Sequence, residues 1–166
     1  MIRRMVRASA LDAKLYEEVE RDRNAVGQAA MVVLIVSVAA GIGQLLSFHP
    51  LGAIAAVISG FLGWIVWSFI TYWLGITFFK TTATRVTPGE VLRTIGFSMT
   101  PGVLAIFSFI PVLGWALFAI GYLWALVAAV IGVRAAFDFT DTGRAVLLTL
   151  LGWLILVLAQ ALLPIL

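Results

Sequence analysis

Residues 24–79 read NAVGQAAMVVLIVSVAAGIGQLLSFHPLGAIAAVISGFLGWIVWSFITYWLGITFF and contain no Lys, Arg, Asp or Glu. Because about 20 apolar residues cross the hydrocarbon core of a bilayer as a helix, this stretch is long enough for two crossings. Residues 94–133 and 145–166 are also uncharged and have room for about two crossings and one crossing. The sequence therefore predicts an all-α fold, a polytopic transmembrane bundle of five helices.

The charged residues lie in three short stretches, Arg3 to Arg23, Lys80 to Arg93 and Arg134 to Arg144. An even number of expected crossings separates these stretches, so all three face one side of the membrane. The positive-inside rule makes that side cytoplasmic. We therefore expect an integral protein of a bacterial inner membrane, with its N-terminus in the cytoplasm and its C-terminus outside.

The composition excludes several classes of function. The chain is 63% hydrophobic and 11% charged, and its net charge is +3. Its basic residues border the expected spans, which favours anionic lipid head groups as partners over nucleic acid. The chain has no cysteine and a single histidine, His49, so it offers no thiol chemistry and no histidine-based metal cluster. No catalytic constellation is apparent, and the sequence predicts a non-enzymatic protein without a cofactor.

Residues 1–24 are expected to form a cytoplasmic amphipathic segment, and residues 25–166 the transmembrane domain. Spans are expected at about 25–46, 51–79, 88–110, 112–133 and 144–166. In the first segment, Ser9 followed by Asp12 resembles a helix start, and an apolar stripe predicts a short helix over residues 10–22. This segment is either a cap on the bundle or an interfacial anchor. In the second case, three basic residues contact lipid head groups: Arg3, Arg4 and Arg7.

The third expected span begins with the capping-box sequence of residues 87–90. Pro101 lies near its middle and predicts a kink there, because proline removes a backbone hydrogen bond. The span carries a candidate intramembrane polar face that either lines a water-filled cavity or packs against other helices: Thr94, Ser98, Thr100 and Pro101.

A second candidate site is a cluster of charged residues at the cytoplasmic side. Its members come from the start of the third span and the connection between the fourth and fifth: Glu90, Arg93, Arg134, Asp138, Asp141 and Arg144. The cluster either holds the helices together or binds a phosphate or a protein partner. Within it, Arg93 is expected either to snorkel to the membrane surface or to pair with acidic groups.

Small residues spaced four apart predict close contact between helices. They are Ala39 and Gly43; Gly52, Ala56 and Gly60; and Gly121, Ala125 and Ala129. We expect these faces to pack within one molecule, with a homo-oligomer as the alternative. Trp64 and Trp67 lie too deep for an interfacial belt and are expected to pack against helices or lipid.

The pattern of motifs resembles the Yip (Ypt/Rab-interacting protein) family in its short bacterial form. The similarity rests on residues 12–20 (DAKLYEEVE), residues 92–97 (LRTIGF) followed by Pro101, residues 111–115 (PVLGW), and residues 132–136 (GVRAA) followed by residues 143–145 (GRA). The resemblance implies five spans and a membrane location. Eukaryotic relatives are linked to Rab GTPases and vesicle traffic and have a long cytosolic N-terminal region, whereas the corresponding region here is only residues 1–24.

These observations lead to two functional hypotheses. The first is a non-enzymatic protein that interacts with partners or organises the membrane. The second is a small carrier or lipid-translocating protein that uses the kinked third span and the charged cluster. The environment of Thr94, Ser98 and Thr100 distinguishes them, because a carrier needs a hydrated site near the midplane.

Overall fold

The computed structural model describes residues 1–80 and 84–162, and every regular element in these residues is helical. Four helices are long and apolar enough to cross a membrane: α3 (Ala25–Leu46), α4 (Pro50–Phe78), α6 (Leu113–Ala136) and α7 (Thr142–Leu162). The bent pair α5 (Pro88–Ser98) and η1 (Thr100–Phe109), taken as one span, brings the number to five. The predicted all-α, polytopic fold is confirmed. Residues 163–166, which end the fifth expected span, lie outside the described residues.

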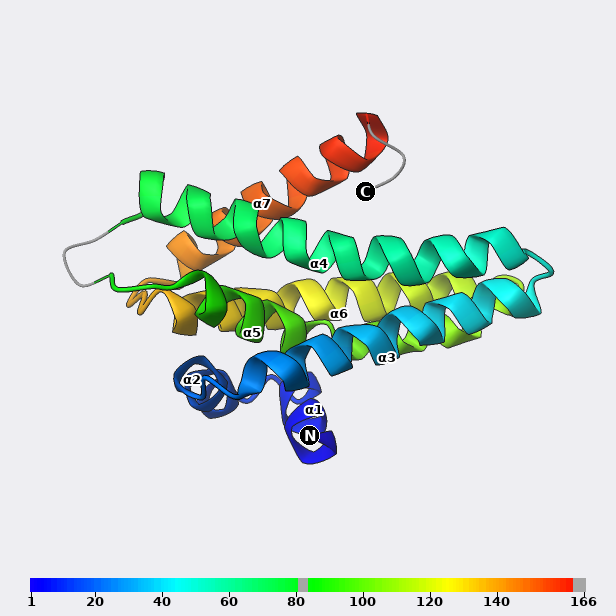
Figure 1. The fold of residues 1–166 in the computed structure, drawn as a ribbon, viewed down its shortest axis with the longest axis horizontal. Helices are drawn as coiled ribbons and strands as arrows, with labels where there is room; N and C mark the ends of the chain where they lie inside the picture. Colours follow the sequence, from blue (N-terminus) through cyan, green and yellow to red (C-terminus); the bar gives the residue numbers. More distant parts are fainter. Residues whose placement is uncertain (81–83, 163–166) are drawn as a thin grey trace.

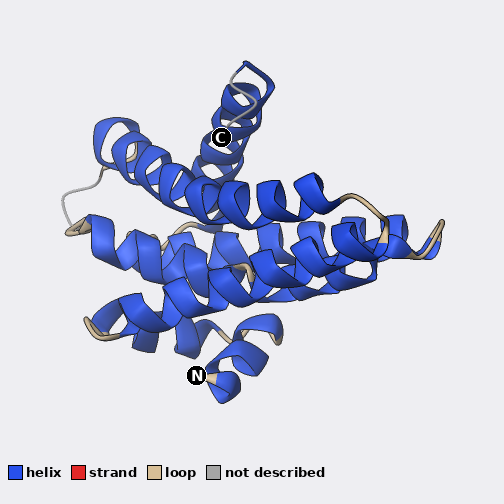
Figure 2. Cartoon of the chain, turned by 45° about the vertical axis from the view of Figure 1, so that its right-hand side comes forward, coloured by secondary structure: helices blue, strands red, loops and turns tan. Residues whose placement is uncertain are grey.

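The spanning helices run side by side and alternate in direction (Figure 1). At one end, which we call the charged end, lie the start of α5, the turn from α6 to α7 and the short helix α2 (Ala13–Arg21), while the short helix α1 (Ile2–Ser9) lies nearer the middle of the bundle. The other end, the uncharged end, consists of the turns at residues 47–49 and 110–112. The helix α7 contacts α4 and α6 and then diverges from the bundle, whose compact part is formed by α3, α4, η1 and α6 (Figures 1 and 2).

The N-terminal segment differs from the single helix expected over residues 10–22. Leu11 has a φ of 59°, which ends α1 and starts a new helix. The cap of α2 is Asp12, whose carboxylate accepts a hydrogen bond from the backbone N–H of Lys14 at 3.0 Å. Ser9 closes α1 and caps nothing. The expected start was therefore wrong, because Asp12 satisfies the first orphan N–H groups itself.

The third span is bent by 44° between α5 and η1, which confirms the predicted kink. It begins with the predicted capping box, in which Thr87 and Glu90 bond reciprocally. Because Pro101 has no N–H, the carbonyl of Phe97 loses its α-helical donor, and the Thr100 hydroxyl takes its place at 2.7 Å. Beyond the bend the chain continues as a 3₁₀ helix, whose larger rise makes η1 about 20 Å long.

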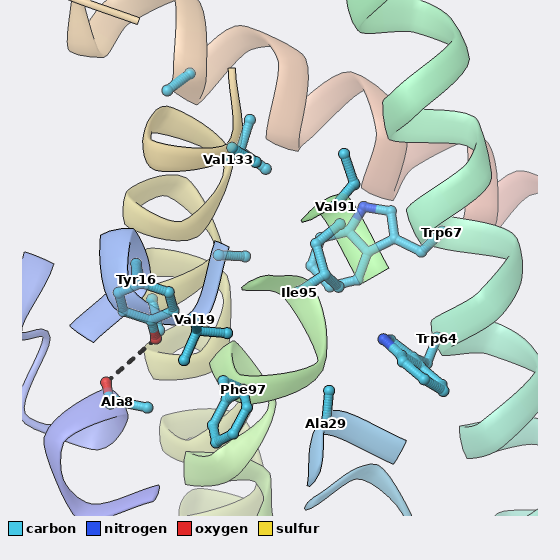
Figure 3. Close-up of a cluster of buried hydrophobic side chains, with 14 of the residues drawn as sticks. Ala8, Tyr16, Val19, Ala29, Trp64, Trp67, Val91, Ile95, Phe97 and Val133 are labelled. Atoms are coloured by element: carbon cyan, nitrogen blue, oxygen red, sulfur yellow. Dashed lines mark hydrogen bonds between the residues drawn. The ribbon is translucent and has the colours of Figure 1, made fainter. Parts of the chain in front are cut away.

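A hydrophobic core joins the charged end to the bundle (Figure 3). Leu15, Tyr16 and Val19 of α2 are fully buried, and α2 packs against α5 and α6. Trp64 and Trp67 of α4 are buried in the same core, as their position in the sequence predicted. The stripe on α2 is therefore part of the core of the protein.

None of the positive-φ residues in the described part of the chain is a glycine. The turns use Leu11, Phe48, Val112 and Asp138 instead, while glycines lie at helix contacts. At Gly43 of α3, an added Cβ would lie 2.6 Å from the carbonyl oxygen of Ala105. The absence of a side chain there lets η1 approach α3 closely.

We expect Gly43→Ala to destabilise the bundle by about 1–3 kcal/mol, because the backbone of η1 cannot move away cheaply. Gly27→Ala is the matched control on the same helix, since a Cβ at Gly27 meets nothing within 4 Å. This control should leave stability unchanged or raise it by up to about 1 kcal/mol through helix propensity. Thermal unfolding in detergent measures both, and equal effects would contradict the close-packing argument.

Candidate functional site

Arg93 is the most deeply placed charged residue of the candidate cluster. It lies on the second turn of α5 and is only 5% exposed. Its Nε donates to the carbonyl oxygen of Val19 at 3.0 Å, and its Nη2 donates to the carbonyl oxygen of Glu20. Both carbonyls belong to the last turn of α2, where backbone oxygens lack helical partners and the helix dipole favours a cation. Arg93 therefore caps α2 from the bundle.

This arrangement differs from both expectations for Arg93. The side chain does not reach the surface, and its hydrogen-bond partners are backbone carbonyls instead of carboxylates. The sequence identified Arg93 as a basic residue and predicted a helix in the N-terminal segment. No pattern in it showed that the end of α2 would lie against α5.

Other residues of the predicted cluster bond to backbone groups and not to one another. The Glu90 carboxylate accepts from the Thr87 N–H at 2.8 Å, and Asp141 accepts from the Gly143 N–H at 2.9 Å, so both serve as helix caps. Arg134 donates from Nε to the carbonyl oxygen of Phe139 at 3.2 Å. Within the described part of the chain, the six residues form no ion pair with one another: Glu90, Arg93, Arg134, Asp138, Asp141 and Arg144.

A groove of about 360 Å³ separates α2 from the end of α6 and brings two members of the cluster beside α2. Its charged lining comes from both sides: Glu17, Glu20, Arg21, Arg134 and Asp138. Burial, with the nearby carboxylates of Asp138 and Glu90, raises the pKa of Glu20 to about 7, while Arg21 and Arg93 act in the opposite direction. The charge of Glu20 therefore changes near neutral pH.

The candidate intramembrane face is packed and satisfied within its own span. Thr94 donates to the Glu90 carbonyl at 3.0 Å, and Ser98 donates to the Ile95 carbonyl at 2.7 Å. Thr94 faces Gly132 of α6, where an added Cβ would lie 3.2 Å from the Thr94 Cβ. Thr94, Ser98, Thr100 and Pro101 are all buried. Thr100 also borders an apolar groove beside α1.

The arginines expected to meet lipid head groups divide into two kinds. Arg4 pairs with Asp22 at 2.9 Å, and Arg7 pairs with Asp12 and Glu18 at 2.7 Å each. Arg3 is exposed and has no ion pair or hydrogen bond to a described residue. Two of the three candidate head-group contacts therefore hold α1 to the segment that follows it.

These ion pairs also change the acidity of their partners. The hydrogen bonds that Arg7 donates lower the pKa of Asp12 and the pKa of Glu18 below their ordinary values. The hydrogen bond from Arg4 does the same for Asp22. All three carboxylates thus stay ionised at neutral pH, when the pairs that fix α1 are intact.

Two contacts of α1 were not predicted from the sequence. The Tyr16 hydroxyl donates to the carbonyl oxygen of Ala8 at 3.3 Å (Figure 3), and the Trp124 indole donates to the carbonyl oxygen of Ser9 at 2.8 Å. Tyr16 directly follows Leu15 in the sequence but was not part of the predicted apolar stripe of Leu11, Leu15 and Val19. Trp124 gave no signal, because its partner is a backbone oxygen far away in the chain.

Among the described residues, no group of three His, Cys, Asp or Glu side chains is arranged to hold a metal ion. The chemistry of the charged end consists of ion pairs, helix caps and one carboxylate that titrates near neutral pH.

We expect Arg93→Leu to destabilise the docked α2 by about 2–4 kcal/mol, because two carbonyl oxygens lose a charged donor. Hydrogen exchange of the α2 amides in the full-length protein should accelerate, and the apparent Tm should fall. Arg85→Leu is the control, since Arg85 is exposed. Equal effects of the two substitutions would show that Arg93 is not what anchors α2.

The raised pKa of Glu20 predicts that docking of α2 weakens as the pH rises. Docked α2 keeps this proton up to about pH 7, whereas a released glutamate loses it near its ordinary value of 4.5. The contribution of Glu20 to docking is therefore fully present below pH 4.5, is lost as the pH rises to about 7 and is constant above. Glu20→Gln should raise the protection factors of the α2 amides at alkaline pH and flatten the pH dependence of these factors, which are corrected for base-catalysed intrinsic exchange. The exposed control Glu17→Gln should leave that dependence in place, and a Glu20→Gln protein that still shows it would contradict the assignment.

Residues 13–163 match the family model of the Yip1 domain. The match begins at the first residue of α2 and includes every candidate spanning helix, while α1 precedes it. Comparison with curated proteins and with solved structures gives no match. The resemblance seen in the motifs is confirmed, because the family model covers most of the chain. With its apolar spanning helices, this chain belongs to the Yip1-domain family of membrane proteins.

Proposed function

We propose that this protein is a non-enzymatic scaffold of a bacterial inner membrane, which organises lipids or interacts with a partner through its charged end. The single observation that carries the proposal is the packed third span. Its hydroxyls bond to carbonyls of the same span, and Thr94 is covered by α6. A scaffold needs a stable surface and no site at the midplane.

The second hypothesis, a carrier, is favoured by one feature, the bend between α5 and η1. Broken helices line the substrate sites of many transporters, because their free backbone groups can bind a solute. Here the carbonyl freed by Pro101 is occupied by Thr100. The bend therefore supports a scaffold at least as well as a carrier.

The proposed orientation places the charged end in the cytoplasm and the C-terminus outside, following the positive-inside rule. The proposed partners are anionic lipids and a protein that binds the charged end, with no role for nucleic acid. A homo-oligomer through the small-residue faces is less favoured. Gly43, Gly60 and Gly121 already have close neighbours in η1, α3 and η1, respectively.

Single cysteines test the orientation cleanly, because the chain has none of its own. Cysteines at His49 and Leu113 should react with an impermeant thiol reagent added to intact cells. A cysteine at Thr140 should react only after the membrane is opened. Thr82, the other site of interest for this test, lies outside the described residues. Labelling of Thr140 from outside would reverse the orientation.

Liposomes that contain the purified protein should show no flux of ions, small solutes or labelled lipid above that of empty vesicles. The reason is that the polar face of the third span is closed by packing. Measurable flux that is lost in the Thr94→Ala, Ser98→Ala double variant would overturn the scaffold proposal and favour the carrier. A Gly27→Ala protein, which alters no contact, is the matched control for reconstitution.

A further inference from the structure

The helix α1 crosses the direction of the spanning helices and lies on the side away from α4 and α7 (Figures 1 and 2). Its helical spacing separates two faces. Ile2, Met5, Val6 and Ser9 share one face, and the three arginines lie on the other. Ile2 is 73% exposed and Val6 is 64% exposed, although both are apolar. A helix with this pattern lies in a membrane interface, with its apolar face toward the acyl chains.

The contacts of α1 fix how far along the bundle it lies. Its apolar face lines a groove of about 430 Å³ with Ile35 of α3 and Thr100 of η1. Its last residue, Ser9, accepts a hydrogen bond from Trp124 of α6. Ile35 and Trp124 each lie eleven residues from the uncharged end of their helix, which is about 17 Å of α-helix. The hydrocarbon core of a typical bilayer is about 30 Å thick.

The turns at the uncharged end do not extend the length of the protein that lies between α1 and the far surface of the membrane. Its turns carry apolar side chains, with Phe48 93% exposed and Val112 86% exposed. Such residues are stable within the interface or the acyl region and do not favour a position out in water. The apolar height between α1 and the far turns is therefore well below that of a bilayer.

The opposite side of the bundle is much taller. The helix α4 has 29 residues without a charged side chain and is about 43 Å long. It can cross a full bilayer even when tilted. The two sides of one molecule thus require different thicknesses of hydrocarbon.

The position of α1 is fixed by several independent contacts. Arg7 binds Asp12 and Glu18, Arg4 binds Asp22, and the Tyr16 hydroxyl binds the Ala8 carbonyl. A helix held in this way cannot easily rise to the surface of an undisturbed bilayer. The lipids can adapt at a modest cost, a fraction of a kcal/mol for each Å of mismatch.

We propose that α1, with the adjoining sides of α3 and η1, forms a lipid-binding surface that thins the bilayer locally on one side of the protein. The partner is the acyl region of the leaflet that contains α1, and short-chain lipid fits this surface best. The inference rests on the proposed membrane-organising function and specifies how the protein would organise lipid, namely by local thinning of the bilayer. Of the three elements that form this surface, α1 precedes the residues that match the Yip1 domain, while α3 and η1 lie within the match.

The test uses full-length protein with a single fluorescently labelled cysteine at Val6, on α1, or at Phe69, on α4. Phe69 is half exposed and lies nine residues from the charged end of α4, a depth comparable to that of Ile35 in α3. The protein is reconstituted in mixed short-chain and long-chain phosphatidylcholine with phosphatidylglycerol, in which one of the two chain lengths is brominated. The ratio of quenching by short-chain lipid to quenching by long-chain lipid should be about twofold higher at Val6 than at Phe69.

Two substitutions in the Val6-cysteine protein separate the surface from the fold. Ile2→Asp should abolish the short-chain excess, because it places a charge on the apolar face. Arg3→Gln, on the opposite face, should keep the excess, and both variants should keep the parent Tm because both side chains are exposed.

Equal ratios at Val6 and Phe69 would overturn the proposal, and so would an absence of quenching at Val6. Either result would leave the scaffold function standing, because that function is tested by solute and lipid flux. Flux together with intact short-chain enrichment would overturn the scaffold function alone.

Discussion

A buried guanidinium that bonds to backbone carbonyls organises the charged end of this bundle. Arg93 meets the last turn of α2, whose carbonyl oxygens would otherwise be buried without donors. The contact sets the position of α2, so that Leu15 and Val19 complete the core. The position of α2 in turn sets that of α1, because Arg7 joins the two helices. Arg93 therefore helps to arrange the N-terminal segment through α2, together with the contacts that α1 makes with Tyr16 and Trp124.

The second constraint is the need of every backbone polar group in lipid for a partner. Pro101 breaks this rule locally, and the neighbouring Thr100 restores it. The resulting bend and 3₁₀ helix leave η1 close to α3 and α6, where Gly43 and Gly121 provide room. Of the hydroxyls that make the third span look like a transport site, that of Thr100 is thus part of the repair of its backbone. The Thr100 hydroxyl is explained by the proline in this membrane helix and does not require a bound substrate.

The sequence predicted the elements of the fold well, because the relevant signals are local. Uncharged stretches of sufficient length indicated the spanning helices, Thr87 and Glu90 indicated a helix start, and Pro101 indicated the bend. It failed where a side chain bonds to a distant backbone oxygen. Arg93 and Trp124 both do so, and a carbonyl oxygen is present at every position and leaves no pattern in the sequence.

The candidate site was affected in the same way. Opposite charges at the charged end indicated ion pairs among six residues, but Glu90 and Asp141 serve as helix caps. The ion pairs formed by described residues lie within the N-terminal segment, between Arg4 or Arg7 and nearby carboxylates. Charge alone could not separate these uses, since a carboxylate near a helix start bonds equally well to an N–H group.

The rigidity of the charged end and the unequal height of the bundle bear on function together. A flexible α1 would adjust its depth to the bilayer, and the protein would leave its surroundings unchanged. Here Arg4, Arg7 and Trp124 fix α1, while α4 on the other side is long enough for a full crossing. The bilayer is then the softer component, and its thickness must vary around the protein. In the proposed function, a membrane protein built in this way acts on lipid through its shape, and this mode of action requires neither a catalytic residue nor a path across the membrane.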